Sequence, residues 1–264
     1  VTNTGTFTRT GTGDQLISSV FNNRGTVANN SASSVFFNNG GADLNATYQP
    51  NAGLIGFGGG TRTVSGSSAV EAGAGAVNFN GATVTFGPGT AYGNVDTTVS
   101  GGTVNFNTGN TVTLDRLTLT AGTLGGSDNI DVVNTLVFNG STVRGTGVLT
   151  NLPGSTATLG AINNTASLAD SRQWVNQGSV DHQGTNPFAN LSLANTSHFV
   201  NEGIYTHSGS GGGQISGSGS VTNTGTFTRT GTGDQLISAV FNNRGTVANN
   251  TASSVFFNNC LLYT

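Results

Sequence analysis

The 264-residue chain contains no methionine and no lysine, and it has one cysteine, four prolines and one tryptophan. Only 7% of its residues are charged, against roughly 25% in an average soluble domain. The single cysteine, Cys260, excludes an internal disulfide and a cysteine-based metal site. Because methionine is absent, we expect Val1 to be an internal position of a longer gene product, so the sequence leaves open whether a signal peptide precedes it.

The basic residues are eight arginines, scattered singly from Arg9 to Arg244, and the formal net charge is −3. A nucleic-acid-binding protein needs a basic stripe to neutralise phosphates, so we expect no nucleic-acid partner. No apolar run approaches the roughly 20 residues of a membrane-spanning helix. The sequence therefore predicts no transmembrane helix in this chain.

Glycine contributes 42 residues, and threonine, asparagine and serine are also abundant. Such a composition also occurs in disordered linkers, but a linker lacks regular apolar spacing. Here hydrophobic residues make up 34% of the chain, and the 15 phenylalanines and many valines and leucines recur at close, commonly alternate, positions. This periodicity favours a folded β-protein over a linker.

The strongest internal signal is a long repeat. Residues 1–39 recur as residues 221–259, with only Ser19/Ala239 and Ser31/Thr251 differing. We interpret residues 1–220 as one full module and residues 221–259 as the start of a second. Near-identity over this length indicates recent duplication, so the parent protein is expected to be an array.

A shorter motif repeats inside this module: an apolar residue, any residue, Asn, any residue, Gly, a variable residue and a second apolar residue. It begins at Val1, Phe21, Trp174, Phe199, Val221 and Phe241, and a weaker copy begins at Leu149. Its asparagines recur at a short, nearly constant interval within each run of consecutive copies: Asn3 and Asn23, then Asn151, Asn176, Asn201, Asn223 and Asn243. A period of about 20–25 residues is typical of a solenoid, in which each repeat is one coil.

The coils are predicted to be β-strands, because Thr, Val and Phe alternate with polar residues and because Gly and Asn interrupt any helical pattern. We expect almost no helix and a parallel β-helix of ten to thirteen coils, with tandem antiparallel β-sandwiches as the alternative. Residues 40–150 keep the alternation without the Asn motif, so less regular coils are expected there.

Three details follow from this prediction. The apolar motif residues, including Phe21, Trp174, Phe199 and Phe241, should stack and be buried, whereas Thr2, Thr4 and Thr6 should face outward. Each motif Asn suits a corner, because it tolerates left-handed geometry and can bond its counterpart in the next coil. Each motif Gly permits a positive φ at the turn.

The Asn-x-Gly-Thr-Phe/Val coils resemble those of bacterial autotransporter passengers and filamentous-haemagglutinin-like surface adhesins. The segments Gly101–Phe106 and Leu117–Leu124 share this resemblance, which is one of rhythm and composition. It implies a right-handed parallel β-helix that is exported to the bacterial cell surface. It assigns no binding residue. The exterior rich in Ser, Thr and Asn can hydrogen-bond surface glycans or proteins of host and neighbouring cells, which we expect as the partners of an adhesive segment.

Residues 260–264 break the coil pattern, because the first copy continues with Gly40 and Gly41 where the second has Cys260 and Leu261. This string resembles a translated sequencing adaptor, so we interpret 260–264 as a non-native scar that packs against nothing. With coils exposed at both ends, the isolated chain is expected to fray or to associate end to end.

Two histidines invite a metal hypothesis. His182 and His207 each follow a motif Asn by six residues and should lie on adjacent coils, with Asp181 or Glu202 nearby. The same position is held by arginine or asparagine in other coils, and a convincing site needs three or four ligands. We therefore assign no metal, no cofactor and no cofactor-binding residue.

The carboxylates are the candidates for catalysis, because polysaccharide cleavage needs two carboxylates facing one bond, or a base beside calcium. Asp115, Asp128 and Asp131 fall within about one coil, next to Arg116. Isolated surface charges explain this grouping equally well, and no calcium-loop pattern is present. The chain is expected not to be an enzyme, and no catalytic residue is assigned.

Two alternatives to adhesion remain open, a polysaccharide-acting enzyme and an ice-binding solenoid. The alternating threonines from Thr2 to Thr12 suggest a flat threonine array, but the coil that begins at Trp174 lacks them. A structural and adhesive extracellular segment is therefore the favoured interpretation.

Overall fold

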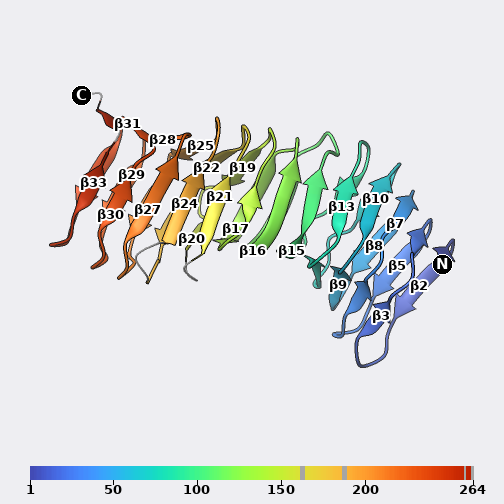
Figure 1. The fold of residues 1–264 in the computed structure, drawn as a ribbon. Coiled ribbons are helices and arrows are strands. Elements are labelled where there is room, and N and C mark those ends of the chain that lie inside the picture. Colours follow the sequence, from blue (N-terminus) through green and yellow to red (C-terminus); the bar gives the residue numbers. More distant parts are fainter. Residues whose placement is uncertain (161–163, 186–188, 259, 263–264) are drawn as a thin grey trace. The chain divides into compact units, whose positions relative to one another are not determined.

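The computed structural model describes residues 1–160, 164–185, 189–258 and 260–262. These residues form β-strands and no helix, and so no helix long and apolar enough to cross a membrane occurs among them. The chain divides into two compact units, residues 1–130 and 131–264. Each unit is a parallel β-solenoid (Figure 1), and the two comprise about 12 turns. The all-β solenoid prediction is confirmed.

The first unit stacks three sets of parallel strands, and two longer strands follow them. The first set is β2 (Thr6–Arg9), β5 (Thr26–Asn29), β8 (Thr47–Pro50), β11 (Ala69–Val70) and β14 (Ala91–Tyr92). The second is β3 (Gln15–Ile17), β6 (Val35–Phe37), β9 (Leu54–Phe57) and β12 (Ala76–Phe79). The third is β7 (Gly41–Leu44), β10 (Thr61–Ser65) and β13 (Thr83–Phe86). β1 (Thr2–Asn3) pairs with β4 (Asn22–Asn23), and β15 (Asp96–Phe106) pairs with β16 (Val112–Gly126).

The second unit also stacks three sets, preceded by β17 (Ile130–Phe138). The first set is β19 (Val148–Asn151), β22 (Gln173–Asn176), β25 (His198–Asn201), β28 (Ser220–Asn223), β31 (Val240–Asn243) and β34 (Cys260–Leu262). The second is β20 (Thr156–Leu159), β23 (Ser179–His182), β26 (Ile204–His207), β29 (Thr226–Arg229) and β32 (Thr246–Asn249). The third is β18 (Thr142–Val143), β21 (Thr165–Leu168), β24 (Ala189–Leu193), β27 (Gly213–Gly217), β30 (Gln235–Ile237) and β33 (Val255–Phe257).

The strand register reproduces the sequence period. β22, β25 and β28 are parallel, and Trp174 is opposite Phe199, which is opposite Val221. Asn176 is opposite Asn201, as expected for residues one coil apart. The strands are parallel and the motif residues are in register, so the tandem antiparallel β-sandwich alternative is wrong for these coils.

Alternate residues of the strands point into each coil and are buried. Phe21, Trp174, Phe199 and Phe241 are at most 3% exposed, whereas Thr2, Thr4 and Thr6 are exposed, which confirms the predicted inside and outside positions. Val1 is the exception among the apolar motif residues at 70% exposed. Val1 precedes β1, which pairs with β4, so a neighbouring coil covers Val1 on that side.

Aromatic side chains stack along the interior of each unit. In the first unit the rings of Phe57 and Phe79 lie 5.5 Å apart between centroids, in nearly parallel planes. Among the described residues of the second unit, Tyr205 and Phe227 lie closest, at 4.2 Å between ring centroids. Stacked coils thus bury apolar surface that one coil alone leaves in water, which is the main stabilising contribution in a solenoid.

The motif asparagines form hydrogen-bonded rows that we call the asparagine ladder. Asn3 donates to Asn23 at 2.8 Å in the first unit. In the second unit Asn151, Asn176, Asn201 and Asn223 each donate from Nδ2 to Oδ1 of the next ladder residue, ending at Asn243, over 2.5 to 2.7 Å. The predicted side-chain bonds between coils are confirmed.

The left-handed geometry that the motif residues permit is not used at the motif asparagines. No motif asparagine has a positive φ; the non-glycine residues with positive φ are Asn45, Asp170 and Asn195. The glycines of the regular motif copies are likewise absent from the positive-φ residues, whereas Gly154 of the weaker copy has a φ of 86°. Glycine is required for another reason: a Cβ on Gly203 would overlap the carbonyl oxygen of Gly178 in the preceding coil. The corner backbones pack too closely for any side chain.

Two further expectations concern regularity and the chain end. The coils between residues 40 and 150 include the long strands β15 and β16, whose pairing shifts register at Ser100, so the expected irregularity is confirmed. The expectation that 260–264 packs against nothing is wrong for Cys260–Leu262, which pairs with Phe241–Asn243. An exposed strand edge offers backbone donors and acceptors to any following segment, whatever its sequence. Residues 263–264 lie outside the described residues.

Compactness and sequence repetition divide the chain at different places. The compact units meet between Ile130 and Asp131, whereas the repeat restarts at Val221. A solenoid coil contacts only its neighbours, so a duplicated module does not have to form a separate compact unit. The modules 1–220 and 221–259, and the scar at 260–264, remain predictions.

Candidate functional site

His182 and His207 face the interior of the second unit from β23 and β26. They lie opposite each other in register, as the sequence predicts, with ring centroids 5.2 Å apart, and both are fully buried. Nδ1 of His182 lies 2.6 Å from the hydroxyl of Tyr205. His182 is therefore held by a hydrogen bond to a buried tyrosine of the next coil.

The carboxylates proposed to accompany the histidines lie elsewhere. Asp181 precedes His182 in the same strand, so it points to the opposite side of the sheet, where Ser208 and Gln183 donate to it. Glu202 is exposed and accepts from Gln177 at 3.1 Å. Among the described residues no three histidine, cysteine, aspartate or glutamate side chains cluster as metal ligands do.

Arg229 occupies the next position of the same inward row and is fully buried. Its guanidinium Nη1 lies 3.1 Å from Nδ1 of His207 and its Nη2 donates to the carbonyl of Gly231. Since arginine only donates, Nδ1 of His207 accepts and its proton resides on Nε2. Burial, followed by the charge of Arg229, lowers the pKa of His207 to about 4.

This environment predicts an acid-sensitive second unit. The pKa of His207 rises from about 4 in the folded protein to its ordinary 6.5 on unfolding. The unfolded state then binds more protons between these values, so stability falls as pH decreases from 6.5 to 4, by about 3 kcal/mol for this residue. Urea unfolding at several pH values, followed by the fluorescence of Trp174, measures the loss.

The control for this pH prediction is His207→Asn, because asparagine already occupies the equivalent inward position at Asn249. The other groups near the ring, His182, Asp181 and Arg229, are retained in the variant. We expect the variant to lose less stability than wild type over this pH range. Equal pH dependence of the two proteins would contradict the assignment.

Of the carboxylates that the sequence offers for catalysis, Asp128 is held by the backbone and a side chain of its own unit. Asp128 is 6% exposed and accepts hydrogen bonds from the backbone N–H and the hydroxyl of Thr108, at 2.6 and 2.7 Å, and from the N–H of Gly109. It thereby holds the turn of the preceding coil. Asp115 is half-buried in β16, and Asp131 belongs to the second unit. These hydrogen bonds give the burial of Asp128 a structural reason.

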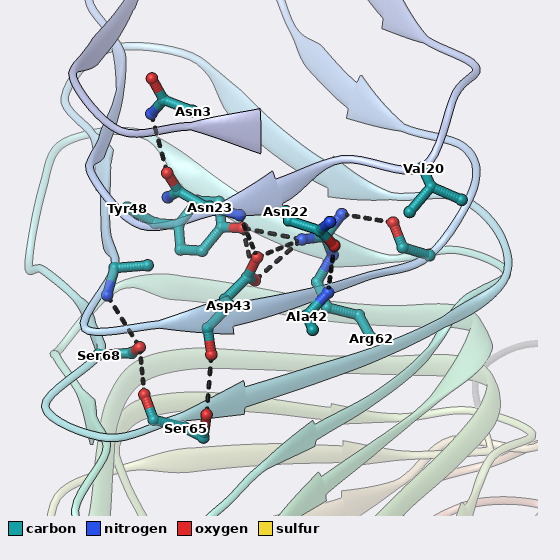
Figure 2. A network of polar contacts seen from close by, with 12 residues as sticks. Asn3, Val20, Asn22, Asn23, Ala42, Asp43, Tyr48, Arg62, Ser65 and Ser68 are labelled. Carbon is teal, nitrogen blue, oxygen red and sulfur yellow. Dashed lines mark hydrogen bonds and ion pairs between the residues drawn. The ribbon is translucent and has the colours of Figure 1, made fainter. Parts of the chain in front are cut away.

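A buried ion pair that sequence reasoning missed lies in the first unit (Figure 2). The carboxylate of Asp43 accepts from Arg62 Nη1 at 2.7 and 2.9 Å and from the hydroxyl of Tyr48 at 2.7 Å. It also accepts from the backbone N–H of Asn23. Both charged side chains are at most 1% exposed. The guanidinium of Arg62 additionally lies 5.1 Å from the ring centre of Phe37.

This cluster closes the asparagine ladder of the first unit. Asp43 lies as far beyond Asn23 in the sequence as Asn23 lies beyond Asn3, so it occupies the next ladder position. In the next coil Val64 lies opposite Asp43, and the row continues with apolar side chains. Arg62 neutralises the carboxylate at this transition, and burial raises the pKa of Tyr48 well above its usual range. The equal spacing of these three ladder residues was the available sequence signal.

A shallow hollow of about 320 Å³ lies on the second unit. We call it the glycine hollow; it is lined by Gly154, Ser155, Gln177, Gly178, Ser179, Gly203 and Ile204. These residues belong to three successive coils at the corner where the motif glycines bring the backbones together. Ile204 is 52% exposed beside it. Gln177 is exposed and Ser179 is half-buried, whereas Ser155 is buried, so the hollow presents one amide and one hydroxyl group next to one apolar side chain.

The threonines from Thr2 to Thr12 do not form a repeated array. Thr6 lies opposite Thr26, but Thr8 lies opposite Ala28 and Thr2 lies opposite Asn22. The register therefore agrees with the sequence argument that this segment is not an ice-binding surface, because threonine does not recur at all of its positions in the next coil.

Comparison of the chain with protein-family models, with curated proteins and with solved structures finds no match.

Proposed function

We propose that this chain is a structural and adhesive segment of a large bacterial surface or secreted protein. Its coils extend a scaffold outside the cell and present polar faces to surface glycans or to proteins of host and neighbouring cells. The proposal includes the absence of enzymatic activity. Export, the cell-surface location and the type of partner belong to the proposal as well.

The observation that carries the proposal is the separation of the two sides of each coil. The inward ionisable groups are engaged with one another or with the backbone, as in Asp43 with Arg62 and Asp128 with Thr108. The outward positions place small hydroxyl side chains opposite one another in adjacent coils, as in Thr156 and Ser179 of the second unit. Repetition of this kind suits an extended binding face rather than one catalytic centre.

The glycine hollow supports a glycan as the partner. Sugars are recognised by convergent hydroxyl and amide groups beside apolar surface, and Gln177, Ser179 and Ile204 supply these groups across adjacent coils. The hollow is open and shallow, so one sugar residue gains little, and binding grows with the number of contacted coils.

The test is binding of the purified chain to an array of neutral and acidic glycans. We expect retention of a subset of glycans by wild type and a loss of that retention in Ser179→Arg, which fills the glycine hollow. Ser192→Arg is the matched control, because Ser192 is also half-buried and outward-facing in the second unit, on β24. Equal binding by both variants would remove the hollow from the proposal, and no glycan or cell-surface binding would refute adhesion.

The enzyme alternative has a separate outcome. Incubation with pectin-like and other acidic polysaccharides, with and without calcium, should release no product. Cleavage that Asp128→Ala or Asp131→Ala abolishes would replace the adhesive assignment with a catalytic one.

A further inference from the structure

The first unit carries two adjacent outward rows, one of threonines alone and one of two threonines and an asparagine, that the Asn motif does not mark. Thr61, Thr83, Thr103 and Thr123 lie opposite one another on β10, β13, β15 and β16, one in each successive coil. Two residues further along the same strands, Thr63, Thr85 and Asn105 form a second row. We call the two rows the threonine face.

The geometry of the threonine face is regular in both directions. Parallel neighbours are about 4.8 Å apart, and alternate residues in a strand are about 6.6 Å apart. No register shift interrupts the pairing of these segments: residues 61–64 pair with 83–86, which pair with 103–106, which pair with 123–126. The hydroxyls, with the amide of Asn105 at one position, therefore form a rectangular net with a fixed repeat.

The side chains of the net are held rigidly. Threonine is branched at Cβ and has few rotamers, so each hydroxyl keeps its position at low entropic cost. The residues between them point inward and are buried, including Val84, Val104 and Phe86. Phe86 stacks on Phe106 with ring centroids 5.3 Å apart and an interplanar angle of 16°. The tightly packed core fixes the spacing at the surface.

The hydroxyls are also available to a partner. Thr61 and Thr83 are exposed, and Thr103 and Thr123 are half-buried. Within the described part of the chain none of these four hydroxyls makes a side-chain hydrogen bond, whereas Thr85 accepts a long one from Asn105 at 3.4 Å. The first row therefore offers four free hydroxyl groups and four methyl groups at one repeat.

The chemistry of the face limits what binds it. Its outward positions carry no charged side chain, which disfavours phosphates and acidic polymers. They carry no aromatic ring, so there is no platform for stacking a sugar or a base. A flexible partner would lose much conformational freedom for a few exposed hydrogen bonds. A rigid partner that repeats in two dimensions engages every hydroxyl without that loss.

We propose that the threonine face binds ice. The surface of ice is an uncharged two-dimensional lattice of water molecules, each able to donate and accept hydrogen bonds, as threonine hydroxyls are. The observation is independent of the glycine hollow, which lies in the second unit, so this proposal stands apart from glycan adhesion. The sequence argument against ice binding applied to the threonines from Thr2 to Thr12, which the coil that begins at Trp174 lacks, and these residues are not part of the threonine face.

The test is partitioning of the whole chain during slow growth of ice from a dilute solution. Wild type should be enriched in the ice relative to a non-binding reference protein. Thr83→Lys places a charge and a long side chain in the middle of the first row and should be excluded from the ice, like the reference. Thr61→Lys, at the end of the same row, should lower the enrichment less.

The matched control is Thr156→Lys in the second unit. Thr156 begins β20 as Thr83 begins β13, and the two strands share the same alternation of exposed, buried, half-buried and buried residues. Its row continues through Ser179 and Ile204, so it lacks the regular hydroxyls. This variant should partition like wild type, and circular dichroism of every variant should match wild type.

Three results would overturn the proposal. They are exclusion of wild type from ice, an equal loss of enrichment in Thr83→Lys and Thr156→Lys, and retention on crystalline cellulose in place of ice with the same dependence on Thr83. If Thr83→Lys fails to fold, the enrichment of Thr61→Lys in ice is compared with that of Thr156→Lys, and an equal loss in the two overturns the proposal. The glycan array run on the same variants reports on adhesion separately, because the glycine hollow is intact in Thr83→Lys and Thr61→Lys.

Discussion

Truncation of Phe199 to alanine is expected to lower the free energy of unfolding of the second unit by about 3–5 kcal/mol. Phe199 is fully buried, and its ring centroid lies 4.7 Å from that of Trp174 and 5.9 Å from that of Tyr205. Removing the ring leaves a cavity between coils that the in-register strands on either side cannot close. Urea unfolding followed by circular dichroism measures the loss.

The control is Ile204→Ala in the neighbouring strand. Ile204 is 52% exposed, so its truncation should change stability by no more than about 0.5 kcal/mol. Wild-type stability in Phe199→Ala would show that the inward and outward positions of β25 are wrongly assigned. Because Phe199 and Ile204 lie in the same coil, a general weakening of that coil would affect both variants.

Replacement of Asp43 by asparagine is the second large effect, an expected loss of about 3–5 kcal/mol in the first unit. The substitution keeps the size of the side chain but leaves the guanidinium of Arg62 buried without a counter-charge. Asparagine also suits the ladder, since Asn23 occupies the preceding position. The loss therefore reports the ion pair and not the shape of the site.

The matched variant removes both charges. In Asp43→Asn with Arg62→Leu, the cluster holds no buried charge, and leucine resembles the apolar residues Val84 and Val104 of the same inward row. We expect the double variant to recover most of the stability that Asp43→Asn loses, in thermal unfolding followed by circular dichroism. A double variant less stable than Asp43→Asn would contradict this account of the cluster.

The repeat period and the alternation were sufficient to predict the solenoid, the buried aromatic residues and the hydrogen bonds of the asparagine ladder. Each of these depends on which residues are equivalent from coil to coil, and the short period of the Asn motif determines that equivalence. For the same reason His182 and His207 could be placed on adjacent coils from their spacing alone.

Backbone geometry at the corners could not be predicted from residue type. Glycine is compatible both with a positive φ and with a close approach of two backbones, and only the packing of Gly203 on Gly178 distinguishes these. The geometry of Asn176 has the same ambiguity, because its side chain bonds between coils in either conformation. Local propensity did not determine the three-dimensional environment.

The buried ion pair and the threonine face were missed because they lie where the motif is absent. Arg62 and Asp43 belong to coils whose repeat is degenerate, so no motif marks them as neighbours. The threonines of the first row recur at nearly equal intervals along the sequence, but the many other threonines hide this period. Only the strand register distinguishes a true structural period of threonines from the chance spacings that a threonine-rich sequence contains.

Sequence-equivalent residues stack in register in adjacent parallel coils, and a designed disulfide between two such residues tests this stacking. Val175 and Val200 face outward and are directly opposite on β22 and β25. Parallel neighbours are about 4.8 Å apart, within the Cα separation that a disulfide spans. In a background of Cys260→Ser, the double variant Val175→Cys, Val200→Cys should form an intramolecular disulfide on mild oxidation, detected by mass spectrometry. A cross-link between cysteines at Val175 and Thr206, which lie on different strand sets, together with none between Val175 and Val200, would contradict the stacked register.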